Sequence, residues 1–359
     1  MFSEKDKMWF WLTNIEGIGR KTRTILLNEY SCPEKIYYTN EDEIRKLNCL
    51  DDKKKDRLIN SKKYDYQNKI DNMVKKQVNF IHPESKKYPK KLLNITDFPH
   101  SLYVRGNIID FSGPSVSVVG SRKCSEYGYE MAYRIGYELA MNGIKVVSGL
   151  ASGIDSAAHR GCIGAKGYPI AVLGCGVDVC YPKHNIDLYM DVMRHGMIIS
   201  EYPVMTQPKA GLFPERNRII SGLGDIIIVV EAGEKSGTFI TVDMALEQGK
   251  EVYVVPGRIS DAQSRGCNRL ISQGANVYTK IEDILSVIKN NHELSVSEND
   301  ENLIGNEINK IYEYIKIVPK HIDDIVNTLN IPLETTVNIL FEMEIRGIIK
   351  HCGNNYYSV

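Results

Sequence analysis

The pattern of hydrophobic and polar positions divides the chain into three stretches. Up to about residue 85, apolar residues recur at helical spacing between Lys-rich segments, beginning with Trp9, Phe10, Trp11 and Leu12. From about 115 to 290, short β-branched runs alternate with helical segments; the runs are VSVV, IKVV, PIAVL, MII, DIIIVV, EVYVV and NVY. Helical spacing returns after residue 305.

The central runs are apolar at consecutive positions, so both faces of each strand are expected to be buried. Strands of this kind are typical of parallel sheets covered by helices on both sides. We therefore predict an α/β fold: a doubly wound, Rossmann-like parallel sheet with a small helical N-terminal domain and a winged-helix-like C-terminal domain. The predicted boundaries are 1–85 for the helical domain, 86–290 for the core, 291–304 for a polar linker and 305–359 for the winged-helix-like domain.

The composition fits a globular protein, because 43% of the 359 residues are hydrophobic and 25% are charged. The apolar run near the N-terminus is too short for a signal sequence or a membrane span, so we expect a cytoplasmic protein. The eight cysteines are scattered, and the pair with the smallest separation, Cys175 and Cys180, has the wrong spacing for a zinc site. We expect neither a metal site nor a disulfide framework.

The net charge of zero conceals a gradient along the chain. Residues 1–90 carry 20 Lys and Arg against 14 Asp and Glu, whereas residues 291–359 carry 5 against 11. A polyanion should therefore prefer the front of the chain. The acidic end, 305–359, is expected to meet a basic protein surface rather than DNA.

Gly- and Ser-rich segments follow nearly every predicted strand. They are VVGSR (118–122), SGLASGID (148–155), LGCG (173–176), EAGEKSGT (231–238) and VPGR (255–258). Ligands bind outside the carboxyl ends of parallel strands, and glycine before a helix N-terminus favours phosphate. A glycine can also merely end a strand, and we keep that interpretation for LGCG and VPGR. For SGLASGID we favour anion binding.

The segment 200–218 is interpreted as a long loop that joins cations to an exposed aromatic ring. Lys209, Arg216 and Arg218 would track phosphates, and Phe213 would stack on a base, as in proteins that hold single strands. The alternative is that Phe213 anchors the loop to the core and that Arg216 pairs with Glu201 or Glu215.

Enzyme and cofactor motifs are missing from the sequence. Neither GxGxxG nor GxxxxGK[ST] occurs after a predicted strand, so we expect no cofactor and no ATP hydrolysis. His159 lies one helical turn beyond Asp155, but a structural histidine is the favoured interpretation because no nucleophile accompanies it. No catalytic residue is assigned. The EGIG turn at 16–19 is either a phosphate-binding helical hairpin or a plain capping turn.

In order and spacing, the motifs resemble the DNA-processing protein A family (DprA, also called Smf). The matching segments are YPKKLLNITDFPHSLYVRGN, VVGSR, SGLASGIDSAAHRG, AVLGCGVDVCYPKHN, ISEYP, FPERNRIISGL, VVEAGEKSGTFIT, VPG and LISQGA, which span roughly 88–280. The resemblance implies a homodimer that binds single-stranded DNA and helps load RecA recombinase during natural transformation.

The motifs and the resemblance together give a set of candidate site residues. The expected contacts with single-stranded DNA are Gly120, Ser121, Arg122, Ser148, Gly149, Ser152, Gly153, Lys183, Lys209, Phe213, Arg216 and Arg218. The resemblance also implies a dimer contact in 260–280, where Leu270, Ile271 and Val277 are apolar.

Two rival functions remain to be compared with the structure. The first is a nucleotide-processing enzyme similar to phosphoribohydrolases, which place a glutamate in GTxxE; here Thr241 stands at that position and Asp243 follows two residues later. The second is a duplex-DNA regulator acting through the C-terminal domain. Its candidate recognition helix, 332–347, carries three glutamates and one arginine, which disfavours the interpretation.

Overall fold

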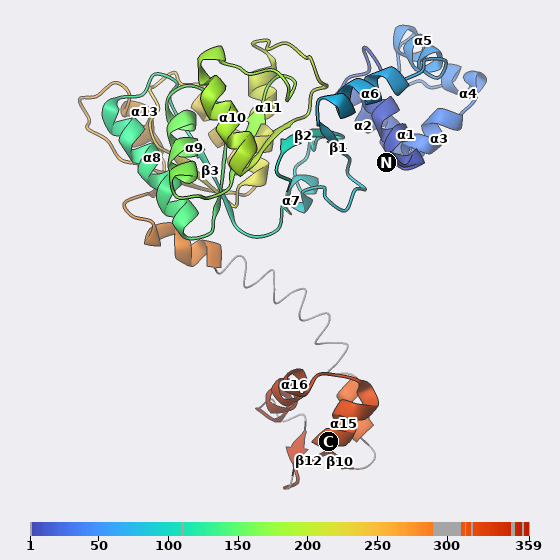
Figure 1. Ribbon diagram of the computed structural model, residues 1–359, viewed down its shortest axis with the longest axis vertical. Helices are drawn as coiled ribbons and strands as arrows, with labels where there is room; N and C mark the ends of the chain where they lie inside the picture. Colours follow the sequence, from blue (N-terminus) through green and yellow to red (C-terminus); the bar gives the residue numbers. More distant parts are fainter. Residues whose placement is uncertain are drawn as a thin grey trace. The chain divides into compact units, whose positions relative to one another are not determined.

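The computed structural model describes residues 2–108, 111–289, 310–312, 314–316, 319–345, 349–353 and 355–358. The chain forms two compact units, Met1–Leu285 and Ser286–Val359 (Figure 1). The predicted linker, 291–304, lies outside the described residues. A helix with the length and apolar surface needed to cross a bilayer is absent from the described part of the chain.

The first unit is built on a nine-stranded sheet in the order β1-β2-β6-β5-β4-β3-β7-β8-β9. Seven of its strands run parallel to one another: β3 (Ser115–Val119), β4 (Lys145–Ser148), β5 (Pro169–Leu173), β6 (Met197–Ser200), β7 (Ile226–Val229), β8 (Glu251–Val254) and β9 (Asn276–Val277). These are the seven predicted runs, so the doubly wound α/β class is confirmed. Two antiparallel strands at one edge, β1 (Asn79–Ile81) and β2 (Leu102–Gly106), were not predicted.

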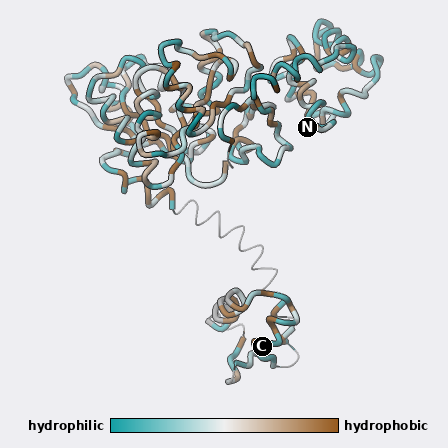
Figure 2. The backbone as a smooth tube through the Cα atoms, in the orientation of Figure 1, coloured by the Kyte–Doolittle hydropathy of each residue, from teal (hydrophilic) through white to brown (hydrophobic). Residues whose placement is uncertain are grey.

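Helices cover both faces of this sheet, as the crossover rule for parallel strands requires. On one side lie α8 (Glu126–Met141), α9 (Ile154–Gly164) and α10 (Ile186–His195). On the other side lie α7 (Lys90–Leu93), α11 (Leu212–Leu223), α12 (Thr238–Glu247) and α13 (Arg265–Ser272). Figure 2 shows brown, hydrophobic stretches running through the interior of this unit.

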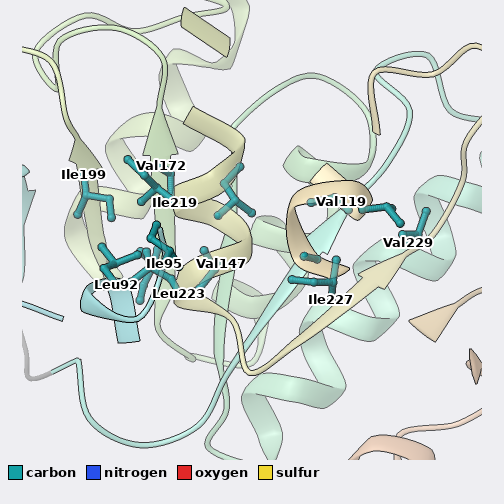
Figure 3. Packing of buried hydrophobic residues seen from close by; sticks show 14 of the residues in the cluster. Leu92, Ile95, Val119, Val147, Val172, Ile199, Ile219, Leu223, Ile227 and Val229 are labelled. Atoms are coloured by element: carbon teal, nitrogen blue, oxygen red, sulfur yellow. The ribbon is translucent and has the colours of Figure 1, made fainter. Parts of the chain in front are cut away.

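Strand β6 illustrates why these apolar runs form buried strands. Met197, Ile198 and Ile199 are all fully buried. Because successive side chains alternate between faces, Ile199 packs in the cluster that contains Leu92 and the residues of α11, as Figure 3 shows. Ile198 packs in the other cluster, with Leu188 of α10. A strand buried on both sides has no polar positions to alternate with apolar ones.

Six helices precede the sheet in the chain, and the first and last of them pack on its antiparallel edge. The six helices are α1 (Glu4–Thr13), α2 (Arg20–Tyr30), α3 (Pro33–Tyr38), α4 (Glu41–Arg45), α5 (Asp52–Ser61) and α6 (Gln67–Lys75). Phe10 of α1 lies in a core cluster with Tyr103 of β2, and Asn14 donates a hydrogen bond of 2.8 Å to the Tyr103 hydroxyl. The boundary expected near residue 85 thus falls between β1 and β2, inside one compact unit.

The EGIG turn joins α1 to α2. Gly17 has a φ of 77°, and a Cβ built there would lie 1.1 Å from the Arg57 guanidinium. Arg57 therefore covers the turn at Gly17, whereas nothing lies within 4 Å of a Cβ built at Gly19. The hairpin and capping interpretations both remain predictions.

The second unit combines helices with a small antiparallel sheet. Its described elements include α15 (Ile322–Leu329), α16 (Leu333–Ile345) and the strands β10 (Lys320–His321), β11 (Lys350–His351) and β12 (Tyr356–Ser358), in the order β10-β12-β11. Ile311, Ile315, Ile325 and Leu340 are buried together. A winged-helix fold remains a prediction for this unit.

Candidate functional site

A groove of about 760 Å³ opens at the carboxyl ends of the central strands. It is lined by the segments that follow β3, β4 and β7, by the start of α11 and by the start of α12. β3 and β7 are neighbours in the sheet, although β4, β5 and β6 separate them in sequence. Open α/β sheets bind their ligands at such a topological switch point. The groove therefore lies where strand order alone would place a ligand.

The β3 exit brings Gly120, Ser121 and Arg122 to the groove lining. The Ser121 N–H donates to the Glu231 carbonyl at 2.7 Å, and the Ile154 N–H donates to the Ser121 carbonyl at 3.2 Å. These two bonds fasten the β3 exit to the exits of β7 and β4. Arg122 remains exposed at the rim.

The glycines of the β4 exit serve contacts within the protein. A Cβ at Gly149 would lie 2.2 Å from the Arg216 guanidinium, and one at Gly153, where φ is 75°, would lie 2.3 Å from the Ser121 carbonyl oxygen. Ser148 is fully buried and donates to the Val118 carbonyl at 2.7 Å. These three residues shape the loop through contacts within the protein. The sequence had predicted that they contact single-stranded DNA directly.

Ser152 lies at a smaller hollow of about 90 Å³ next to the groove. The hollow shares Arg122, Tyr181 and Phe213 with the groove lining. The Ser152 hydroxyl lies 3.0 Å from Nε2 of His184. Of the predicted β4-exit residues, Ser152 is thus well placed to meet a ligand.

Asp155 occupies the first turn of α9 and lines the groove. Its carboxylate accepts hydrogen bonds from the N–H groups of Gly149 at 3.0 Å and Ala151 at 3.3 Å. Burial raises the pKa of Asp155, while the charge of Arg216 opposes that rise. Because a carboxylate already stands at this helix N-terminus, the site is less suited to a phosphate than the sequence suggested.

Arg216 and Arg218 are buried rather than exposed on a loop, because α11 begins at Leu212 and carries both residues toward the sheet. The Arg216 guanidinium donates to the carbonyls of Gly149, at 2.8 Å, and Val172. Burial lowers the pKa of Arg216, and Asp155 opposes this shift. Arg216 lines the groove and thus joins two strand exits at its floor.

Arg218 forms an ion pair with Glu201, and each side chain is only 6% exposed. It is absent from the groove lining. The alternative pairing considered for Arg216 therefore belongs to Arg218, while Glu215 accepts a hydrogen bond from the Tyr202 hydroxyl at 3.0 Å. This pair fixes α11 against the end of β6.

Three side chains form a stack at the groove mouth. The rings of Tyr181 and Phe213 have centroids 5.3 Å apart with planes inclined by 29°, and the Arg122 guanidinium carbon lies 5.3 Å from the Phe213 centroid. Phe213 is partly buried and packs on Gly174, whereas Tyr181 is 40% exposed. Both interpretations of Phe213 thus find support: it is anchored, and it belongs to an aromatic surface.

Tyr181 was missed at the sequence level. It stands in the YPKHN motif, where only the charge of Lys183 drew attention. A tyrosine between a cysteine and a proline has no periodic signal that separates a core ring from an exposed one. Its proximity to Phe213, 32 positions away, appears only after folding.

Exposed cations surround the mouth of the groove. Arg122 and Lys123 follow β3, and Lys209 lies between Pro208 and Ala210, which both line the groove. Lys183 is exposed in the short 3-10 helix Lys183–Asn185, next to Tyr181 and Pro182 at the hollow. A concave surface with one sign of charge at its rim attracts a polyanion.

The residues that suggested an enzyme do not converge in the groove. Thr241 lines it, but Asp243 is exposed and absent from the lining. His159 is fully buried in α9, and burial lowers its pKa to about 3, so the ring is neutral near pH 7. Among the described His, Cys, Asp and Glu residues, no group of three is arranged to hold a metal ion.

The predicted dimer residues differ in exposure. Leu270 of α13 is 7% exposed and packs in the main core cluster, so it is unavailable to a partner. Ile271 is partly buried against the same cluster. Val277, on the edge strand β9, is 40% exposed. Only the last is well placed for an intermolecular contact.

Comparisons with known proteins identify relatives of this chain. The family model for DNA recombination-mediator protein A matches residues 79–289. DNA processing protein DprA of Bacillus subtilis is 42% identical over 208 residues, which cover 58% of this chain and 70% of that protein.

Two solved structures resemble the chain. The X-ray structure of DprA from Streptococcus pneumoniae superposes with a TM-score of 0.67 at 33% identity, over 79% of this chain and 97% of that one. DNA processing protein A from Helicobacter pylori, described for its single-stranded DNA binding mode, gives 0.54 at 27% identity, over 60% and 97%.

Proposed function

Because this chain belongs to the DNA recombination-mediator protein A family, we propose that it grips single-stranded DNA in the groove at the strand ends and helps load RecA recombinase during natural transformation. The complete proposal is a cytoplasmic homodimer that works without a cofactor. The relative from Helicobacter pylori is described for its single-stranded DNA binding mode, which supports single-stranded DNA as the ligand of this chain.

The observation that carries the proposal is the stack of Tyr181, Phe213 and Arg122 at the mouth of a groove rimmed by cations. An exposed ring offers a face on which a base can stack, and neighbouring cations attract the phosphates on either side. Duplex DNA keeps its base faces covered by the neighbouring pairs. The arrangement therefore favours a single strand over a duplex.

We assign the phosphate contacts to the exposed cations and the base contact to the aromatic pair. Arg122, Lys183 and Lys209 would neutralise phosphates along the mouth. The Ser121 hydroxyl, and the N–H and hydroxyl of Ser152, would add hydrogen bonds beside them. Arg216 would act from below, by holding the β4 and β5 exits at their present separation.

A nucleotide-processing enzyme is the second candidate, and the groove lining disfavours it. A phosphoribohydrolase needs a carboxylate aimed at the sugar. In the described lining the carboxylate is that of Asp155, which is committed to two backbone N–H groups. We therefore propose a binding protein without hydrolase activity; incubation with nucleoside monophosphates should release no free base.

The test of the proposed function is a fluorescence-anisotropy titration of a labelled thymine oligomer. The parent should bind the oligomer tightly and a duplex of the same length weakly, and Arg122→Glu should weaken oligomer binding about tenfold or more. The matched control is Arg194→Glu, which reverses the charge of an exposed arginine in the last turn of α10, at the opposite end of the strands. Equal binding by the parent and Arg122→Glu would place the DNA elsewhere.

A further inference from the structure

We propose that Lys76 and Asp178 are positioning residues that hold the groove loop, residues 201–211, in the shape that DNA binding needs. The inference rests on the proposed function, because it concerns how the same groove is held ready. It gives the N-terminal helices a role distinct from contact with DNA.

The groove loop joins β6 to α11 and brings Pro208 and Ala210 to the groove lining, with Lys209 between them. Its turn is strained, since Met205 has a φ of 66°, a value that side-chain-bearing residues rarely adopt. A conformation of this kind persists only when surrounding contacts impose it. The contacts at Met205 therefore determine where Lys209 stands.

The loop after β5 supplies those contacts. Oδ1 of Asp178 accepts a hydrogen bond of 2.7 Å from the Met205 N–H, and the Gly176 N–H donates to the Thr206 carbonyl at 2.9 Å. A Cβ at Gly176 would lie 2.8 Å from both Asp178 Oδ1 and the Pro203 carbonyl oxygen. Gly176, the second glycine of LGCG, thus permits the groove loop to lie against the β5 exit.

Lys76, the residue that caps α6, completes the tether. Its Nζ lies 2.5 Å from Oδ2 of Asp178, whose side chain is only 7% exposed. A carboxylate so far removed from water needs a counter-charge, which Lys76 supplies. Beside it, the Asn72 amide lies 3.6 Å from the sulfur of Met205. Helix α6 therefore contacts the strained turn both through Asp178 and directly.

A second contact holds the beginning of the groove loop. Nη1 of Arg20, in the first turn of α2, lies 3.7 Å from the Glu201 carboxylate, which also pairs with Arg218 of α11. The helical part of the chain thus touches the loop at its start and at its turn. Lys76 and Asp178 form the link at the turn that a single substitution can break cleanly.

The substitution Asp178→Asn separates positioning from direct DNA contact by the sign of its effect on affinity. Asp178→Asn keeps an oxygen for the Met205 N–H but removes the charge that holds Lys76. If Lys76 itself contacted phosphate, Asp178→Asn would free it and DNA would bind more tightly. If Lys76 acts through Asp178, the same substitution loosens the loop and DNA binds more weakly.

The experiment titrates the full chain and its variants with a labelled thymine oligomer at several salt concentrations. We expect Lys76→Met and Asp178→Asn each to weaken binding about three- to tenfold, with the double variant no weaker than either. The salt dependence of the affinity should keep the slope of the parent in these variants. Lys76→Arg, which keeps the positive charge, should bind like the parent. Lys75→Met, a substitution of the exposed neighbouring lysine, is the control and should bind like the parent.

Tighter binding by Asp178→Asn, or a salt slope reduced by about 0.7 in Lys76→Met, would make Lys76 a direct phosphate contact and overturn the inference. Unchanged affinity in both single variants would also overturn it. The double variant replaces a partly buried ion pair with a neutral pair, so it keeps the test open if a single variant folds poorly.

A readout without DNA separates this inference from the proposed function. Lys209 is exposed, so a trypsin cut after it reports on the mobility of the groove loop. The cut should be faster in Lys76→Met and Asp178→Asn than in Lys75→Met. Equal cleavage rates would sink the positioning role even if the protein binds single strands, and faster cleavage would support it even if the ligand proved different.

Discussion

At the scale of single residues, the groove mouth combines an anchored ring with an exposed one. Phe213 packs on Gly174, so its removal would disturb the protein as well as the ligand. Tyr181 presents the more accessible face. The exposed ring is therefore the better probe of base stacking.

We predict that Tyr181→Ala weakens binding of a thymine oligomer by about 1–3 kcal/mol, the usual contribution of one stacked base. Tyr181→Phe should bind nearly like the parent, because the ring face is kept. Tyr38→Ala, at a tyrosine of the helical part that is 75% exposed, is the control for general loss of aromatic surface. An anisotropy titration in which Tyr181→Ala matched Tyr38→Ala would remove Tyr181 from the binding surface.

Two buried histidines predict how the protein responds to acid. Burial lowers the pKa of His100 and His159 to about 3, against about 6.5 in an unfolded chain. The unfolded state therefore binds more protons at any pH between these values. The stability that depends on the neutral rings is complete above pH 6.5 and is lost as the pH falls toward 3.

Each histidine should contribute a slope of about 1.4 kcal/mol per pH unit within that window. The measurement is urea unfolding between pH 7 and pH 5, followed through Trp9 and Trp11, the two tryptophans of the chain. His100→Asn should show a shallower slope than the parent, whatever its stability at pH 7. Identical slopes would mean that His100 does not titrate as its burial implies.

Residue types could be predicted at the groove better than residue roles. Arg122 and Ser121 lie where the sequence placed them, because they directly follow a strand whose end fixes their position. Arg216 and Arg218 were expected at the groove rim but are buried in α11. The start of this helix lies within a Pro-rich stretch, which gave no clear sequence signal for a helix N-terminus. Whether a cation faces solvent or a carbonyl depends on that one boundary.

At the scale of elements, the apolar runs of the parallel strands were predictable, whereas the antiparallel edge strands β1 and β2 were not. β3 to β8 are buried on both faces, so their composition alone identifies them. β1 has only three residues, and β2 contains Arg105 and ends at Gly106. Their pairing also depends on the helices packed against them, which a local pattern does not show.

We predict that β9, at the other edge of the sheet, forms the dimer contact. β9 pairs with β8 on one side, and an unpaired strand edge is a template for association with another chain. Sedimentation velocity should show the parent as a dimer and Val277→Arg as predominantly a monomer. Val74→Arg, at an exposed valine of α6, should leave the dimer intact. A monomeric parent would contradict the proposal.

At the scale of the whole molecule, the charge gradient along the chain predicts that the acidic second unit does not contribute to DNA binding. Within this unit Ile325 and Leu340 are fully buried, whereas Val337 is 46% exposed. The exposed Asp323 and Asp324 fit the expectation that this unit avoids a phosphate backbone.

Deletion of 305–359 should leave affinity for a thymine oligomer unchanged or slightly raised, because net negative charge is removed. Anisotropy at low salt is the sensitive measurement. RecA loading onto the same oligomer, followed in parallel, should change if this unit meets a protein. A large fall in DNA affinity would assign the unit a place in the binding surface.

The most direct test of the groove as the DNA site is photo-cross-linking. The full chain is mixed with a thymine oligomer that carries one 5-iodouracil, and the complex is irradiated. The oligomer should attach to the peptides that carry Tyr181 and Phe213, because iodouracil reacts with aromatic rings that stack on it. Mass spectrometry identifies the attached peptides, and Tyr181→Ala should lose most of the product. Cross-links confined to residues 1–75 or 310–358 would contradict the central claim.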